Sequence, residues 1–136
     1  MVRVRMYVGF SEEDPTAWSV RMESHDYRKN SAGRVEANPA CTGCEARCPM
    51  PKTTYAAIKA AFRNLHMDCQ VAIYSRNNRA QMDLQMGMAS QHPMWQEASA
   101  AVRTHKHSIT FVGVPEGTLN LGVSKADKIA RKLRHK

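Results

Sequence analysis

The chain has 136 residues, 43% hydrophobic and 24% charged, which is typical of one folded domain and excludes wholesale disorder. No apolar run approaches the roughly 18–20 residues of a membrane span, and the first residues lack the apolar core of a signal peptide, which predicts a cytoplasmic protein. Twenty Lys and Arg against twelve Asp and Glu give a net charge of +8, and this excess favours a polyanionic partner over a membrane.

The first half of the chain is predicted to be mostly strands. Alternating apolar and polar residues predict a strand over 2–9. A second strand is expected over 17–23, after the turn-forming residues 11–15. A polar hairpin over 25–33 and a short third strand over 34–37 are expected to follow. Residues 38–52 contain three prolines and three cysteines, which predicts an irregular Cys-rich loop.

The second half is predicted to alternate between helices and strands. The expected elements are a helix over 53–66, a strand over 69–75, Met-rich helices over 78–89 and 94–105, a strand over 107–114 and a basic C-terminal helix over 122–136. The methionines at 82, 86, 88 and 94 are expected to fill the core, with Trp18 and Trp95 as core anchors. His105 and His107 are expected to face solvent.

The C-terminal segment carries much of the positive charge. From residue 125 onward there are six Lys and Arg and one acid, Asp127. The candidate contacts to a polyanion on this helix are Lys125, Lys128, Arg131 and Lys132. The alternative is a solvated helix on which Asp127 pairs with a neighbouring Lys or Arg.

Four segments resemble the ribonuclease H-like superfamily. VRMYVGFS (4–11) resembles the family's first strand, TYAAIKAAF (54–62) its first helix, and VAIYSRNN (71–78) its fourth strand. ITFVGVP (109–115) with ADKIA (126–130) resembles its last strand and last helix. The resemblance implies a single α/β domain over 1–136, with a five-stranded mixed sheet, strands 1–3 antiparallel, flanked by helices.

The resemblance also implies where catalytic carboxylates should lie. The family cleaves RNA in a hybrid with two metal ions, which several acids must neutralise and hold. Three of the expected acids fall on Gly9, Thr53 and Arg76, and Asp127 is the acid that remains. We therefore expect no Mg²⁺ site and no catalysis. The alternative is a metal-dependent ribonuclease with a rearranged site, using an acid from 12–14.

The turn after the fourth strand is a second candidate binding site. Arg76, Asn77, Asn78 and Arg79 form a donor-rich turn that opens a helix, where an anion is favourably bound. In the resemblance, Asn78 falls where the family has a Gln that contacts nucleic acid. The alternative is a helix N-cap beside a solvated arginine.

Cys41, Cys44 and Cys48 have metal-ligand spacing, because a two-residue spacer lets two thiolates turn toward one ion. Structural zinc and free thiols are both open hypotheses, and a three-Cys iron–sulfur cluster is a weaker one. A zinc site needs a fourth ligand, for which His25, His92 and Glu45 are candidates. Cys69 is expected to face the core instead.

These patterns together predict a catalytically inactive domain that binds nucleic acid, whether RNA, an RNA–DNA hybrid or a ribonucleoprotein, as in a viral or mobile-element protein. The alternative of another class is a protein-interaction factor that inhibits or recruits a partner enzyme, steered to an acidic partner by its charge.

Overall fold

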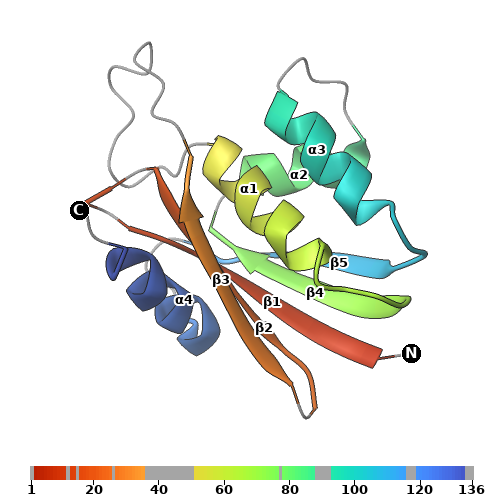
Figure 1. Ribbon diagram of the computed structural model, residues 1–136, viewed down its shortest axis with the longest axis horizontal. Helices are drawn as coiled ribbons and strands as arrows, with labels where there is room; N and C mark the ends of the chain where they lie inside the picture. Colours follow the sequence, from red (N-terminus) through yellow and green to blue (C-terminus); the bar gives the residue numbers. More distant parts are fainter. Residues whose placement is uncertain are drawn as a thin grey trace.

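A computed structural model describes residues 2–11, 13–14, 16–25, 27–35, 51–76, 78–87, 93–115 and 119–133 (Figure 1). The elements, in chain order, are β1 (Val2–Phe10), β2 (Ala17–Glu23), β3 (Arg28–Arg34), α1 (Pro51–Phe62), β4 (Cys69–Ser75), α2 (Asn78–Met86), α3 (Pro93–Val102), β5 (Ser108–Gly113) and α4 (Leu121–Arg131). This order of strands and helices is the predicted one.

The strands form one open, mixed sheet of five strands in the order β3-β2-β1-β4-β5. β1 pairs antiparallel with β2, and β2 pairs antiparallel with β3. β4 is parallel to β1, and β5 is parallel to β4. Parallel neighbours need long crossovers, and here helices occupy them. The chain therefore has the predicted α/β class, with strands 1–3 antiparallel.

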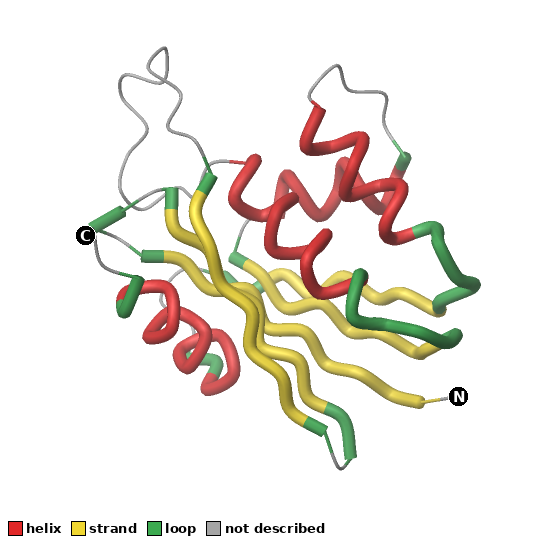
Figure 2. The backbone as a smooth tube through the Cα atoms, viewed as in Figure 1, coloured by secondary structure: helices red, strands yellow, loops and turns green. Residues whose placement is uncertain are grey.

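Three helices cover one face of the sheet, as Figure 2 shows. Val4, Met6 and Val8 point to this face from alternate positions of β1, and they belong to one buried cluster with Tyr55 and Ile58 of α1. Trp95 and Ala98 of α3 complete the cluster from further out, and Trp18 packs at its border. The main hydrophobic core lies between the sheet and α1–α3.

The last helix, α4, packs alone on the opposite face (Figure 1). Its buried residues are Val123, Ala126 and Ala130, which follow one stripe of the helix. The side chain of Asn120 caps its start, since its Oδ1 accepts a hydrogen bond from the Val123 N–H at 3.0 Å. This helix leaves part of its sheet face uncovered.

Several predicted boundaries are wrong. The third strand spans 28–34, not 34–37, because a polar edge strand pairs only with β2 and lacks the apolar alternation that marks a buried strand. The Cys-rich loop ends before Pro51, which opens α1, a common place for proline. Helix α1 ends at Phe62 rather than at residue 66, and α4 ends at Arg131.

Three side-chain placements also differ from the predictions. Met82 and Met86 do not fill the core, since they are 55% and 66% exposed on α2. His107 is not solvated: it lies edge-on to Phe62, and its Nε2 is buried.

None of the helices in the described ranges is long and apolar enough to cross a bilayer.

Candidate nucleic-acid interface

Arg76 directly follows β4, and its guanidinium reaches back to α4. Its Nη1 lies 2.5 Å from Oδ2 of Asp127, with the two side chains 30% and 17% exposed. The other carboxylate oxygen of Asp127 accepts a hydrogen bond from the Phe10 N–H at 2.9 Å. Both carboxylate oxygens of Asp127 are thus engaged, and the Arg76 guanidinium already neutralises the negative charge that would attract a metal ion.

Helix α4 also closes the position at which the family resemblance places the first carboxylate. A Cβ atom added at Gly9 would lie 2.2 Å from the backbone carbon of Ala126, and the Ser19 hydroxyl donates to the carbonyl of that residue. No side chain fits at Gly9 unless the helix moves. Thr53, the third replaced position, is fully buried in the first turn of α1.

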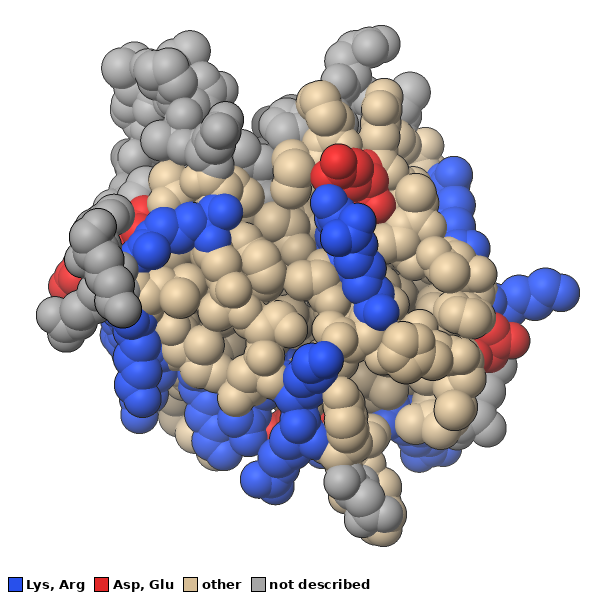
Figure 3. Space-filling view, viewed as in Figure 1, with Lys and Arg blue, Asp and Glu red and all other residues tan. Residues whose placement is uncertain are grey.

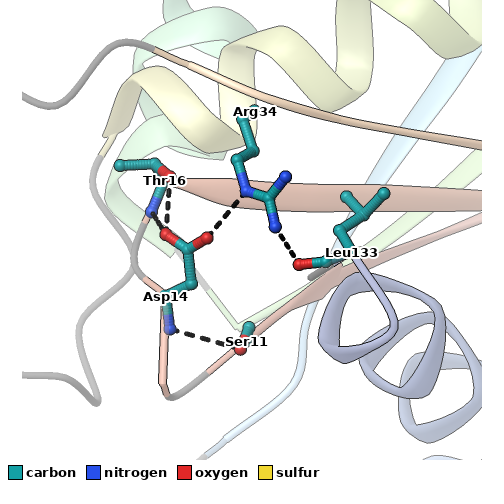
Figure 4. A network of polar contacts seen from close by, with 5 residues as sticks. All are labelled: Ser11, Asp14, Thr16, Arg34 and Leu133. Atoms are coloured by element: carbon teal, nitrogen blue, oxygen red, sulfur yellow. Dashed lines mark hydrogen bonds and ion pairs between the residues drawn. The ribbon is translucent and has the colours of Figure 1, made fainter. Parts of the chain in front are cut away.

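Among the described acids after β1, Asp14 is held by residues other than Asp127. Asp14 accepts hydrogen bonds from the Thr16 N–H and hydroxyl and from Arg34, while its own N–H donates to Ser11 (Figure 4). Burial by itself raises the pKa of Asp14, but the bonds from Thr16 and Arg34 outweigh it and hold that pKa below its usual value. Arg34 also donates to the Leu133 carbonyl. This acid therefore ties a loop to the end of α4. Glu13 is exposed, and Glu12 lies outside the described residues.

The predicted basic residues of α4 lie on its solvent side. Lys125, Lys128, Arg131 and Lys132 are all exposed, opposite the buried stripe. Lys and Arg side chains gather over α4 and the lower end of the β2–β3 hairpin in Figure 3. Lys128 and Arg131 lie in the last turn of α4, where cations interact favourably with the helix dipole. The helix thus presents a cluster of cations to solvent.

The turn after β4 is brought to the same end of the sheet as Asp127, through Arg76. The prediction that Arg76 contacts a phosphate directly stays a prediction. Because Arg76 is already paired with Asp127, a phosphate would have to share the guanidinium with that carboxylate or displace it. Asn78 and Arg79 do open a helix, α2, as predicted. Asn77 and the side chains of Asn78 and Arg79 lie outside the described residues.

The cysteines fall into two groups. Cys41, Cys44 and Cys48 lie outside the described residues, so zinc binding there stays a prediction. Cys69 is buried in the main core, as expected, and its thiol contacts the Met67 carbonyl. Burial raises the pKa of this thiol. Over the described ranges, no three His, Cys, Asp or Glu side chains converge as metal ligands.

A second group of cations, which the sequence did not predict, lies on the sheet itself. The strand register places Arg3, Arg5, Arg21 and Arg28 on the face that carries α4. A cavity of about 510 Å³ opens beside Arg3 and Arg5. The alternation of arginines in β1 indicates that they share one face of the strand, but it does not tell which face of the sheet a helix covers.

No family model and no curated protein sequence matches the chain.

Proposed function

We propose that the chain is a catalytically inactive ribonuclease H-like domain that binds nucleic acid, as RNA, an RNA–DNA hybrid or a ribonucleoprotein, through the cations of α4 and the turn at Arg76. The five-stranded mixed sheet, with antiparallel β1–β3 and helices on both faces, is compatible with the fold that the sequence resembles. The observation that carries the proposal is the exposed row of cations on α4, next to an ion pair where the family would hold metal.

The Arg76–Asp127 pair supports inactivity for an electrostatic reason. Two-metal hydrolysis needs a cluster of negative oxygens around the ions. Here the acid expected in that cluster already has a guanidinium at 2.5 Å and a backbone donor at 2.9 Å. A phosphate, by contrast, is attracted by the same guanidinium and by the nearby lysines. The site therefore favours binding a backbone over cutting it.

The first test is a mobility-shift gel with labelled RNA–DNA hybrid, duplex RNA and duplex DNA, each with Mg²⁺, Mn²⁺ or EDTA. The expected result is retarded, intact nucleic acid in every lane, with one preferred duplex. Metal-dependent shortening that Asp127→Asn abolishes would instead establish the rearranged nuclease. Absence of any shift at low salt would refute duplex binding.

The second test locates the interface on α4. The double variant Lys128→Gln/Lys132→Gln removes two exposed cations from the helix. Each lost phosphate contact lowers the salt dependence of log K by about 0.9 for duplex DNA, so the slope should fall by about 1.8. The charge-matched control Arg63→Gln/Arg103→Gln alters the exposed cations that directly follow α1 and α3 and should leave binding unchanged. An unchanged slope in the α4 variant would remove the helix from the interface.

The protein-interaction alternative draws support from α2. Met82 and Met86 are four residues apart and mostly exposed, and flexible exposed methionines suit adaptable protein contacts. Stoichiometric capture of one protein after nuclease treatment, lost in Met82→Gln/Met86→Gln, would favour this function. Capture that nuclease treatment abolishes would favour nucleic acid.

A further inference from the structure

We propose that the part of the sheet left uncovered by α4 binds single-stranded nucleic acid, with phosphates on Arg3 and Arg5 and one unpaired base in the cavity beside them. This inference rests on the proposed nucleic-acid binding and names a second surface and a substrate class for it. The surface, called here the open sheet face, consists of Arg3, Arg5, Gln70, Ala72, Ser108 and Thr110.

The open sheet face is built as two rows across three strands. The register aligns Arg3 of β1 with Gln70 of β4, and Gln70 with Ser108 of β5. Two residues further along, Arg5 aligns with Ala72, and Ala72 with Thr110. Since residues two apart share one face of a strand, all six side chains project to the side of the sheet that carries α4.

The next row along the strands marks where the helix begins to cover the sheet. Tyr7 aligns with Tyr74, and their rings stack with centroids 4.9 Å apart. Gly122 of α4 sits directly against the Tyr7 ring, where an added Cβ would come within 2.3 Å of it. The helix thus covers the sheet from Tyr7 onward. The two rows before it line an open cavity of about 510 Å³, together with His25 of the β2–β3 turn.

The charge of this surface suits a polyanion. Arg28 of β3 lies in the row of Arg5, whose partner on β2 is Glu23, and Arg21 lies in the next row, beside Tyr7. At this end of the sheet, one described acid of the strands, Glu23, shares the face with four arginines: Arg3, Arg5, Arg21 and Arg28. Glu23 lies 2.7 Å from Arg21 and 3.6 Å from Arg5. The hydrogen bond from Arg21 holds the pKa of Glu23 below its usual value, so this acid is ionised and its charge is fully matched. The remaining arginines leave the face positive.

The arginine nearest the sheet end is positioned for a phosphate. The Arg3 Nε donates to the Gln70 side-chain oxygen at 3.2 Å, which orients the guanidinium at the cavity wall. A guanidinium fork matches two phosphate oxygens. Arg5 is 56% exposed and lies two residues further along the same strand. The pair can therefore contact successive phosphates of one extended strand.

The shape of the cavity favours an unpaired base over a duplex. Ala72 contributes only a methyl group to its lining, which leaves room above the strand. Gln70, Ser108 and Thr110 line it with hydrogen-bonding side chains. Such groups read the edges of bases, which a duplex keeps paired and stacked inside. At the same end of the sheet, Tyr27 is 49% exposed and His25 is exposed, which offers rings for stacking neighbouring bases.

The test measures fluorescence anisotropy with labelled RNA and DNA single strands of about 12 nucleotides, the site size of such surfaces, and with matching duplexes. Arg3→Gln/Arg5→Gln should weaken single-strand binding and lower its salt slope by about 1.4, at about 0.7 per contact. Ala72→Leu fills the cavity without changing charge. It should weaken single-strand binding about tenfold through the lost base contacts, with the slope and duplex affinity unchanged.

Thr110→Ile is a second filling variant, from a β-branched to a β-branched residue in an exposed strand position, and keeps the test decisive if Ala72→Leu does not fold. Full single-strand affinity in both folded filling variants would overturn the base cavity. If Arg3→Gln/Arg5→Gln leaves all affinities intact while Lys128→Gln/Lys132→Gln lowers them, the open sheet face is refuted and the proposed function stands. If the wild-type chain binds no strand or duplex, the proposed function itself fails.

Discussion

The two faces of the sheet are built from the same strands but by different chemistry. On one face, Val4, Met6 and Val8 meet α1 and α3 in a broad apolar core. On the other, the intervening residues include Arg3 and Arg5. The one described helix on this face, α4, is held by a much smaller apolar cluster around Tyr7 and Val123, together with close backbone approach and polar contacts. The difference teaches that one face supplies most of the buried apolar area, which leaves the other free to carry charge.

The largest expected effect tests the close approach of α4. Gly9→Ala should destabilise the fold by about 3 kcal/mol, because the new Cβ meets backbone that no side-chain rotation can clear. Gly33→Ala is the matched change toward the other face, where the neighbour is the Trp18 ring at 2.9 Å. It should cost about 1 kcal/mol, since a partly buried ring can shift. Urea unfolding measures both, and equal losses would contradict the contrast.

A second, intermediate effect tests the polar contacts of the α4 face. Asp127→Ala removes the acceptor of the Phe10 N–H and the partner of Arg76. It should cost about 2–3 kcal/mol, and Asp127→Asn, which keeps an acceptor oxygen, about 1 kcal/mol. Glu97→Gln breaks an exposed ion pair with Lys59 over α1 and α3 and should change the unfolding free energy too little to measure. A loss in Glu97→Gln as large as in Asp127→Ala would show that the two faces use ion pairs alike.

The smallest effect concerns His107, which contacts Phe62 of the apolar core. His107 Nδ1 accepts a hydrogen bond from the Cys69 N–H, and burial holds the pKa of His107 below its ordinary value. The unfolded chain therefore takes up this proton first as the pH falls, and the stability contributed by neutral His107 decreases from about pH 6.5 downward. His107→Gln should lose less stability between pH 8 and pH 5 than the wild type.

Thermal melts across this pH range measure that difference. His25→Gln serves as the control, because it alters an exposed imidazole of the β2–β3 turn and should retain the wild-type pH dependence. An identical pH dependence in His107→Gln and the wild type would show that another group dominates.

Sequence patterns predicted the fold well wherever one side of an element is buried. β1 shows the period of two and α1 the period of three to four, because each meets the core along one stripe. β4 was predicted from its compact apolar run. β3 was misplaced because it lies at the edge and its residues are polar. Met82 and Met86 were misjudged because hydrophobic spacing on a short helix does not reveal whether anything packs on it.

The candidate site was harder to predict than the fold, because its contacts join distant parts of the chain. Asp127 was expected to pair with a neighbour on its own helix as the structural alternative, yet its partner, Arg76, is 51 residues away. Exposure of the α4 cations followed from their spacing on the helix. The rows of the open sheet face required the strand register, which alternation within one strand cannot supply.

The contact between Gly9 and α4 has a consequence for the history of such a domain. A carboxylate introduced at Gly9 would displace the backbone at Ala126 before it could meet any ion. Each single step toward a metal centre would therefore lose folding stability and gain no reactivity. Selection can adjust the charges on this domain one residue at a time, whereas a carboxylate at this position would need the helix and the strand to change together.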